Sequence, residues 1–291
     1  MLPNLNMAPL DLFGLELHAF GFLVGLAVIT GTILAGRRAR QIGLSERVVA
    51  DVAIWAVVVG FVGAHLYSAV FYFPERIAEN PLYLLKVWDG ISSFGGFIGG
   101  TLGVILYFRR HKDLPFLPYA DAIIYGFAFA WIFGRLGCTI AFDHPGSMTD
   151  FFLGMDYQGS KLVSPGVRHN LGMYEFFWAI GLSIFFFLSR TKTHFKGWYV
   201  AVFVITYMPF RFLLDFLREK QDIRHLGLTG GQWAAIALLG LAIWLVVRAM
   251  KTRDMLVPDG QPKLRPEAEM QALGLKQGGG GNRHSNKARA R

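Results

Sequence analysis

The stretch from Trp198 to Leu217 reads WYVAVFVITYMPFRFLLDFL and holds only two charged residues, Arg211 and Asp215. A helix needs about 20 mostly apolar residues to cross a bilayer, because the hydrocarbon core is about 30 Å thick. The stretch therefore predicts a membrane-spanning helix. Its two charges need a physical reason, because an ionisable side chain at bilayer depth costs about 2.5–3.5 kcal/mol on insertion scales.

Six further stretches of this kind are spread over the chain. They are Leu17–Ala35, Val48–Phe73, Ile91–Phe108, Tyr119–Gly137, Leu171–Leu188 and Gly230–Val247. Of all 291 residues, 53% are hydrophobic, which is more than a soluble domain of this length needs. We therefore expect an all-α integral membrane protein with about seven transmembrane helices, of which the short, glycine-rich stretch at 91–108 is the weakest.

Basic residues follow the first, third, fifth and seventh stretches. The four clusters are Arg37, Arg38 and Arg40; Arg109, Arg110 and Lys112; Arg190, Lys192 and Lys196; and Arg248, Lys251 and Arg253. Cytoplasmic loops of membrane proteins carry an excess of lysine and arginine. We therefore expect the N-terminus outside and the C-terminus in the cytoplasm.

Net charge and cysteine content also limit the kinds of partner and site that the chain can have. The formal net charge of +9 suits contact with anionic lipid headgroups, and the basic residues are too scattered between apolar stretches to favour nucleic-acid binding. Cys138 is the only cysteine, so no intramolecular disulfide can form. The sequence has no CxxC motif and no Cys/His ligand spacing, so we expect no metal site and no cofactor.

The two ends of the chain differ in character. No Lys or Arg precedes the first apolar stretch, so we expect that stretch to remain in the mature protein. After Pro258 the chain becomes polar and basic and ends in the run QGGGGNRHSNKARAR. We predict a transmembrane domain over residues 1–257 and a basic, disordered cytoplasmic tail over residues 258–291.

A polar stripe runs along the second half of the stretch from Trp198 to Leu217 and ends one residue beyond it. Tyr207, Arg211, Asp215 and Arg218 are four, four and three residues apart, so they share one face of a helix. Asp215 can pair with both arginines. One interpretation is a structural ladder of ion pairs between helices. The other, which we favour, is an anion site, because two arginines around one carboxylate leave a positive charge and a guanidinium fits a phosphate.

Arg135 is a second charge at membrane depth, in the run GRLGC near the outer end of the stretch 119–137. One reading is a side chain that extends out to the headgroups. Flanking glycines leave room beside the backbone and favour a functional site. The outer loop that follows holds Asp143, His144, Asp156, Arg168 and His169. By contrast, we interpret Asp51, His65 and Asp121 as structural residues within the helices, with Asp121 in a pair at the cytoplasmic side.

Five runs of the sequence together resemble a known family. They are HAFGFLVGLAV at 18–28, FYFPERIAENPLYLLKVWDGISSFGGFIGG at 71–100, GRLGCTIAFDHPG at 134–146, RHNLGMYE at 168–175 and YMPFRFLLDFLREKQD at 207–222. In their order and spacing they resemble the bacterial prolipoprotein diacylglyceryl transferases, over roughly residues 12–250. The resemblance implies a multi-pass enzyme of the bacterial cytoplasmic (inner) membrane.

This family moves the diacylglyceryl group of phosphatidylglycerol onto the thiol of a lipobox cysteine and releases glycerol phosphate. The resemblance therefore implies three partners, namely phosphatidylglycerol, the prolipoprotein signal peptide with its lipobox cysteine, and the lipid bilayer. It implies no nucleic acid.

The resemblance also implies the site residues. Arg135 stands at the family's signature arginine, Arg211 stands at its second essential arginine, and Tyr207 lies one turn earlier. Asp215 takes the place of the usual glutamate, and Asp121 also matches a family position. The expected catalytic residues are Arg135, Arg211 and Asp143, with Asp143 or His144 helping the thiol lose its proton. The expected substrate-binding residues are Arg135, Tyr207, Arg211, Asp215 and Arg218.

Several positions depart from the family pattern. The histidine of its glycine-rich motif is replaced by Phe94 or Gly95, depending on the alignment. The replaced residues elsewhere are two asparagines (now Cys138 and Ala141), a glutamate (Asp143), a tyrosine (Phe20) and an arginine (His65). Two alternatives therefore stay open, namely a divergent transferase that uses phosphatidylglycerol with another acceptor, and a non-enzymatic protein that binds or transports lipid.

Overall fold

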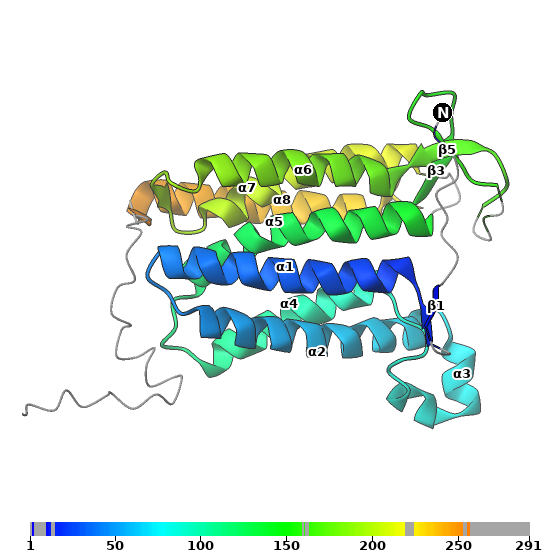
Figure 1. Cartoon of the computed structure of the whole chain (residues 1–291), viewed down its shortest axis with the longest axis horizontal. Helices are drawn as coiled ribbons and strands as arrows, with labels where there is room; N and C mark the ends of the chain where they lie inside the picture. The colour runs from blue at the N-terminus through cyan, green and yellow to red at the C-terminus, as the bar shows by residue number, and fades with distance from the viewer. Residues whose placement is uncertain are drawn as a thin grey trace, which may run out of the picture.

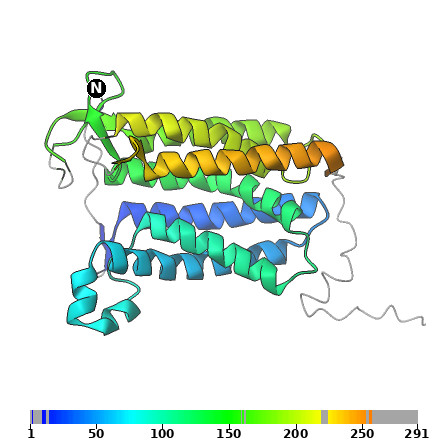
Figure 2. The same ribbon diagram turned by 180° about the vertical axis from the view of Figure 1, so that it is seen from behind.

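Seven long helices run along a common direction and form a bundle in the described part of the chain (Figure 1, Figure 2). The computed structural model describes residues 2, 10–12, 15–158, 160, 163–218, 224–252 and 255–256. The helices are α1 (Ala19–Gln41), α2 (Glu46–Phe71), α4 (Ser93–Arg110), α5 (Phe116–Ala141), α6 (Leu171–Ser189), α7 (Trp198–Leu214) and α8 (Gly230–Thr252). They coincide with the seven predicted stretches, and the tail predicted from residue 258 lies outside the described residues.

The outer faces of the bundle are those of a membrane protein. Among the described residues, six helices are long and apolar enough to cross a membrane, α4 being the one of the seven that does not qualify. Large apolar side chains such as Phe22, Ile29 and Leu188 are exposed on the bundle surface. Their exposure is favourable in hydrocarbon and costly in water. The prediction of an all-α integral membrane protein is therefore confirmed, as is the weakness of its third stretch.

Close backbone contact explains why the glycine-rich α4 still belongs to the bundle. It lies along α2, and a Cβ added at Gly99 would stand 2.5 Å from the carbonyl oxygen of Val59. Helices in lipid gain little from the hydrophobic effect, so small residues that allow close packing hold them together. Figure 1 shows the resulting arrangement, with α1, α2 and α4 on one side and α5 to α8 on the other.

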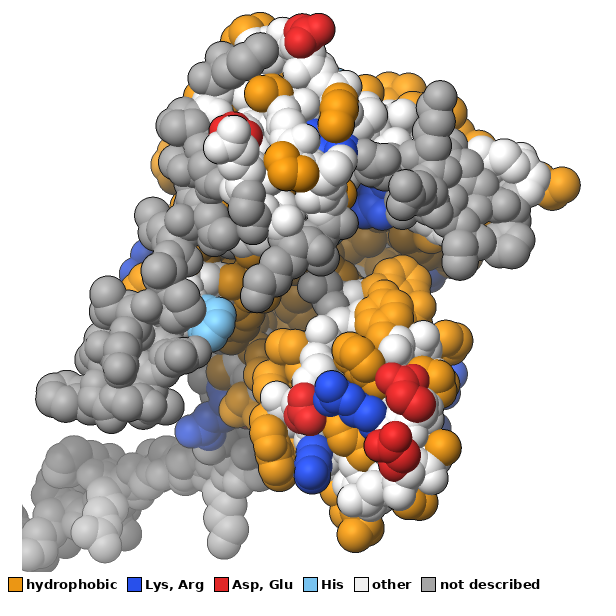
Figure 3. Space-filling model, turned by 90° about the vertical axis from the view of Figure 1, so that its right-hand side faces the viewer, with side chains coloured by type: hydrophobic (Ala, Val, Ile, Leu, Met, Phe, Trp, Pro, Cys, Tyr) orange, Lys and Arg blue, Asp and Glu red, His pale blue; other side chains and the backbone are white. Residues whose placement is uncertain are grey.

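The connections at the end where α1 begins form a cap of short elements. A three-stranded sheet has the order β3 (Pro145–Met148), β5 (Val167–Asn170) and β4 (Met155–Asp156). Short helices α3 (Pro74–Glu79) and η1 (Pro81–Leu85) and the strand pairs β1 (Leu10–Leu12) with β2 (Leu15–Leu17) and β7 (Arg224–His225) with β8 (Leu228–Thr229) complete this end. Seen from this side, the molecule is hollowed between its upper and lower parts, and hydrophobic side chains line the hollow (Figure 3).

The opposite end of the bundle collects the basic clusters, because α1, α4, α6 and α8 all end there (Figure 1). β6 (His194–Phe195) and β9 (Met255–Leu256) pair at the same end. Arg38 is buried there and donates to the carbonyl oxygen of Arg190 at 2.6 Å. The gathering of basic residues at one end is what the predicted orientation requires, and the orientation itself stays a prediction.

Two titratable residues inside the helices have structural partners. Asp121 of α5 accepts hydrogen bonds from the backbone N–H groups of Gly197 at 2.6 Å and Tyr199 at 2.8 Å, so it caps the N-terminus of α7. His65 of α2 is fully buried and bonds to the carbonyl oxygens of Tyr83 and Asp89. The structural interpretation of both residues is confirmed, although the partners of Asp121 are backbone amides rather than a charged side chain.

Candidate functional site

Arg135 lies near the C-terminal end of α5 and is only 8% exposed. Its Nε lies 2.5 Å from Oε2 of Glu175, and its guanidinium carbon lies 4.2 Å from the centre of the Trp131 ring. Its Nη2 donates to the hydroxyl of Tyr207 at 3.4 Å. These contacts direct the guanidinium into the bundle, so the reading of a side chain extended to the headgroups is wrong.

Glu175 of α6 connects the arginines of two other helices. It is completely buried. Besides Arg135, its Oε2 accepts a hydrogen bond from the Tyr207 hydroxyl at 3.1 Å, and its Oε1 lies 3.5 Å from Nη1 of Arg211. Sequence reasoning gave Glu175 no role. The signal that could have found it is a carboxylate inside a predicted span, which at bilayer depth requires a partner.

Asp215 is the second buried carboxylate, at the point where α7 passes into η2 (Asp215–Leu217). Its Oδ1 lies 2.7 Å from Nη1 of Arg211 and 3.2 Å from Nε of Arg218. Its other oxygen accepts a hydrogen bond from the Thr229 hydroxyl, one residue before α8. The pairing expected from the sequence spacing is therefore found, and Asp215 also holds the start of α8 against the end of α7.

Arginines outnumber their paired carboxylates in this cluster. Three arginines, at 135, 211 and 218, form ion pairs with two carboxylates, at 175 and 215, among the contacts that the described residues show. The side-chain exposed fraction rises from 9% for Arg135 to 18% for Arg211 and 28% for Arg218. An anion can therefore approach from the side of Arg211 and Arg218. The sequence predicts two arginines around one carboxylate, and the structure adds Arg135 and Glu175 to this group.

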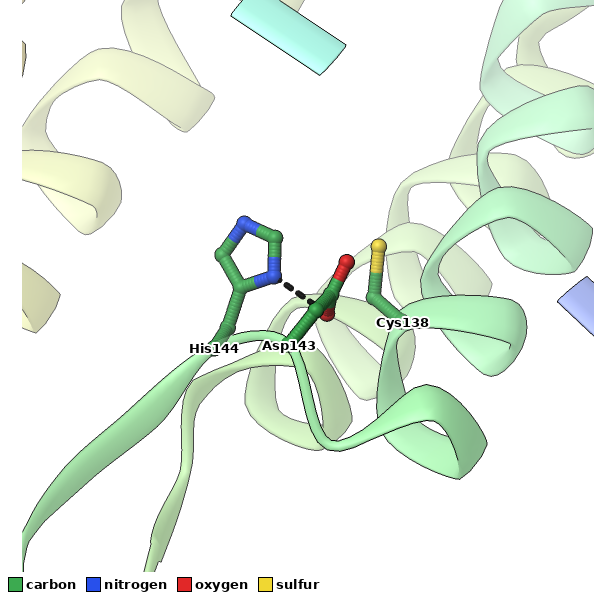
Figure 4. Close-up of side chains that lie close together, drawn as sticks. All are labelled: Cys138, Asp143 and His144. Atoms are coloured by element: carbon green, nitrogen blue, oxygen red, sulfur yellow. Dashed lines mark hydrogen bonds and ion pairs between the residues drawn. The ribbon is translucent and has the colours of Figure 1, made fainter. Parts of the chain in front are cut away.

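A second group of side chains follows the end of α5. Phe142 adopts a left-handed backbone conformation with a φ of 56°, which turns the chain back over the last turn of the helix. Asp143 then lies between the thiol of Cys138 and the imidazole of His144 (Figure 4). Oδ1 of Asp143 is 2.5 Å from Nδ1 of His144, and the ligand atoms of all three residues lie within 4.8 Å of one another.

Arg135 connects this second group to the arginine cluster. Its Nη1 lies 3.9 Å from Sγ of Cys138, and its guanidinium also interacts electrostatically with Asp143. Cys138 is buried, whereas the side chains of Asp143 and His144 are 30% and 20% exposed. The two groups therefore form one polar region at the capped end of the bundle.

The other charged residues of the predicted outer loop have local partners. Arg168 is buried and donates to Oγ of Ser164 at 2.7 Å and to the carbonyl oxygen of Gly146 at 3.2 Å. Nδ1 of His169 lies 2.7 Å from the Tyr174 hydroxyl, and partial burial lowers the pKa of this histidine. These contacts fix the loop that covers the end of α5.

The two positions that could replace the histidine of the glycine-rich motif differ in the room they leave for a side chain. A Cβ added at Gly95 would lie 2.5 Å from the carbonyl oxygen of Gly63, so no side chain fits there. Phe94 is 55% exposed, and its ring packs edge-on against that of Tyr67 at 5.2 Å. Of these two positions only 94 has room for a side chain, and neither holds a titratable group.

The fold and site define a class of protein, a multi-pass membrane protein with an arginine-rich polar site at one end of its helix bundle. The model of the prolipoprotein diacylglyceryl transferase family matches residues 8–248. The chain therefore belongs to the prolipoprotein diacylglyceryl transferase family, a family of membrane transferases, as the sequence motifs indicated.

Individual relatives agree with the family model. The chain is 30% identical over 238 residues to the phosphatidylglycerol–prolipoprotein diacylglyceryl transferase of Clostridioides difficile, which covers 78% of this chain and 93% of that protein. It is 30% identical over 259 residues to phosphatidylglycerol–prolipoprotein diacylglyceryl transferase 2 of Streptomyces coelicolor, and the match covers 85% of this chain and 81% of that protein. Transferase 1 of the same organism is 27% identical over 278 residues, and that match covers 93% of this chain and 79% of the relative.

Proposed function

We propose that this chain transfers the diacylglyceryl group of phosphatidylglycerol to the thiol of a lipobox cysteine in a prolipoprotein, and releases glycerol phosphate. The observation that carries the proposal is the partly buried cluster in which Arg135, Arg211 and Arg218 surround two carboxylates at the end of a membrane bundle. The names of its relatives supply the two substrates.

Arg135 and Arg211 bind the phosphate of the lipid in this proposal. Charge develops on the departing glycerol phosphate, and fixed guanidinium groups stabilise that charge without reorganising during the reaction. Glu175 and Asp215 hold the guanidinium groups in place, and the Tyr207 hydroxyl bonds to both Arg135 and Glu175. The ion pairs between helices and the anion site are thus compatible, because the pairs orient the arginines and the guanidinium groups attract the phosphate.

Arg218 is the most exposed member of the cluster and extends its positive charge toward the accessible side. A phosphate that enters from this side meets Arg218 first and Arg211 next. Apolar side chains line the hollow at the same end of the molecule, which suits the acyl chains of the lipid (Figure 3). In the predicted orientation this end faces the outer leaflet of the bacterial inner membrane.

Asp143 assists the acceptor thiol. The thiolate is the nucleophilic form of cysteine, so a proton must leave before attack. Asp143 is hydrogen-bonded to His144, is partly exposed and interacts with Arg135, so a thiol beside it would also be beside the phosphate. The thiolate attacks the glyceryl carbon, the carbon–oxygen bond to the phosphate breaks, and the electron pair leaves with glycerol phosphate.

The test is a transfer assay with the purified chain, phosphatidylglycerol and a lipobox peptide. We expect glycerol phosphate release together with a peptide mass gain of one diacylglyceryl group. Arg135→Ala and Arg211→Ala should each abolish both signals, whereas Arg109→Ala, an exposed arginine at the opposite end of the bundle, should keep them. Full activity in either site variant would overturn the assignment of the arginines.

A divergent acceptor is the second candidate, and the residues around the acceptor position favour it. Cys138 and Asp143 stand where the resemblance leads one to expect asparagine and glutamate, and Phe94 or Gly95 takes the place of the histidine, while both principal arginines remain. Phosphatidylglycerol consumption with a modified acceptor other than the lipobox peptide would support this candidate. Movement of lipid across vesicles with no covalent product would instead overturn the transferase proposal.

A further inference from the structure

A groove lies between α1 and α2 at the end of the bundle opposite to the arginine cluster, where a short turn joins the two helices (Figure 1). Its volume is about 680 Å³. Arg37 and Arg40 line it from the last turns of α1, and Glu46 and Arg47 line it from the start of α2. We propose that this groove binds the headgroup of an anionic phospholipid from the surrounding bilayer leaflet.

The groove offers two arginines to a ligand. Arg40 forms an ion pair with Glu46. The guanidinium groups of Arg37 and Arg47 are exposed and have no hydrogen-bond or ion-pair partner among the described residues. Arg38 of the same basic cluster differs, because it is buried and donates to a backbone carbonyl oxygen. Two charges therefore remain for an anion, and a guanidinium is the side chain best shaped to bind a phosphate.

The position of the groove at the membrane boundary favours a lipid over a soluble anion. Its charged residues lie just beyond the apolar stretches that predict the two spans, whereas Ile33 and Ala50, which also line it, belong to those stretches. The exposed side chains of Ile29 and Ile54 follow one turn further along each helix. A phosphate on the arginines would therefore place its acyl chains along apolar faces that suit hydrocarbon. Basic pockets between transmembrane helices bind anionic headgroups in this way.

The groove is separate from the proposed active site. Phe20, near the start of α1, lies beside the end of α5, because a Cβ added at Gly137 would be 3.1 Å from its ring. Arg37 follows 17 residues later in the same helix, which is roughly 25 Å along the axis at about 1.5 Å per residue. The two sites can therefore hold different lipid molecules, and binding in the groove does not depend on the proposed function.

The first measurement is lipid binding by the delipidated full chain in a neutral detergent. Phosphatidylserine is the probe, because it is anionic and is not the proposed substrate, and phosphatidylcholine is the comparison, because its headgroup has no net charge. Native mass spectrometry should show phosphatidylserine bound about tenfold more strongly than phosphatidylcholine. Phosphatidylserine should also raise the melting temperature, because a ligand that binds only the folded state stabilises it. Equal binding of the two lipids would overturn the proposal.

Paired charge variants then locate the binding. Arg37→Gln combined with Arg47→Gln should weaken phosphatidylserine binding about tenfold and remove the rise in melting temperature, because the groove loses its two unpaired arginines. Arg109→Gln combined with Arg110→Gln is the matched control. It removes two exposed arginines from the end of α4, at the same end of the bundle but outside the groove, and should keep both signals. Equal losses in the two double variants would show a general attraction to this end and overturn the groove as the site.

A variant that keeps every charge tests the shape of the groove. Ala50→Leu adds a larger side chain to its lining and should weaken phosphatidylserine binding, whereas binding within twofold of the parent chain would overturn the site. Arg135→Ala, at the opposite end, should keep the rise in melting temperature, and its loss there would assign the lipid to the arginine cluster instead. Displacement of the lipid by equimolar inorganic phosphate would overturn a lipid as the occupant. Melting temperatures without lipid show whether each variant is folded.

Discussion

Glu175 holds the polar site together at the scale of single residues, because it lies on α6 and contacts Arg135 on α5 and both Arg211 and Tyr207 on α7. Glu175→Gln keeps the shape and removes the charge, so buried guanidinium groups lose their partner. Removing one member of a buried pair typically costs about 3–5 kcal/mol. We expect a lower melting temperature in detergent and at least a tenfold loss of transfer, since Arg135 loses its ion pair and Arg211 keeps only its ion pair with Asp215.

Glu79→Gln is the matched control, because Glu79 is exposed at the end of α3. The same chemical change there should leave both the melting temperature and the transfer activity unchanged. Transfer by Glu175→Gln within twofold of the parent chain would contradict the positioning role. A loss of stability alone would leave Glu175 as a structural residue.

The junction of α7 and α8 matters at the scale of elements, because Asp215 accepts a hydrogen bond from Thr229 while it binds two arginines. A Cβ at Gly231 would lie 2.8 Å from Oδ2 of Asp215. Gly231→Ala should therefore displace the carboxylate, cost about 1–3 kcal/mol of stability and reduce transfer. Gly230→Ala is the control, since nothing lies within 4 Å of its added Cβ, and urea titration together with the assay measures both variants. Equal behaviour of the two variants would show that this junction tolerates side chains.

Asp121 also acts at the scale of elements, because its carboxylate caps the N-terminus of α7. Asp121→Ala removes the acceptor of the backbone N–H groups of Gly197, Tyr199 and Val200, at the far end of the helix that carries Tyr207 and Arg211. Loss of a cap typically costs about 1 kcal/mol, and up to about 2. We expect reduced stability by thermal unfolding and a smaller loss of transfer than for the site variants. Asp113→Ala, which changes an exposed aspartate beyond α4, should alter neither quantity. Abolished transfer in a stably folded Asp121→Ala would point to a direct role instead.

Across the whole molecule, the sequence predicts what depends on local length and period. Apolar length gave the seven helices, and the 3.6-residue repeat gave the pairing of Asp215 with Arg211 and Arg218. Glu175 was missed because its partners lie on α5 and α7. The spacing of residues along one helix does not show which other helices pack against it. The closeness of Cys138 to Asp143 and His144 was not predicted, because it depends on the left-handed turn at Phe142, which is an unusual conformation for a bulky residue.

Orientation in the membrane is the property of the whole molecule that now needs a direct test. Four basic clusters follow helices that all end on one side of the bundle, and positively charged loops stay in the cytoplasm. Green fluorescent protein fused after residue 291 should therefore fluoresce, and alkaline phosphatase fused there should be inactive. Fusions after residue 150, in the loop beyond α5, should behave in the opposite way. Reversed signals at both positions would place the arginine cluster at the cytoplasmic face. A lipobox cysteine on the outer side of the membrane could not reach it there, so the proposed function would fail on geometry alone.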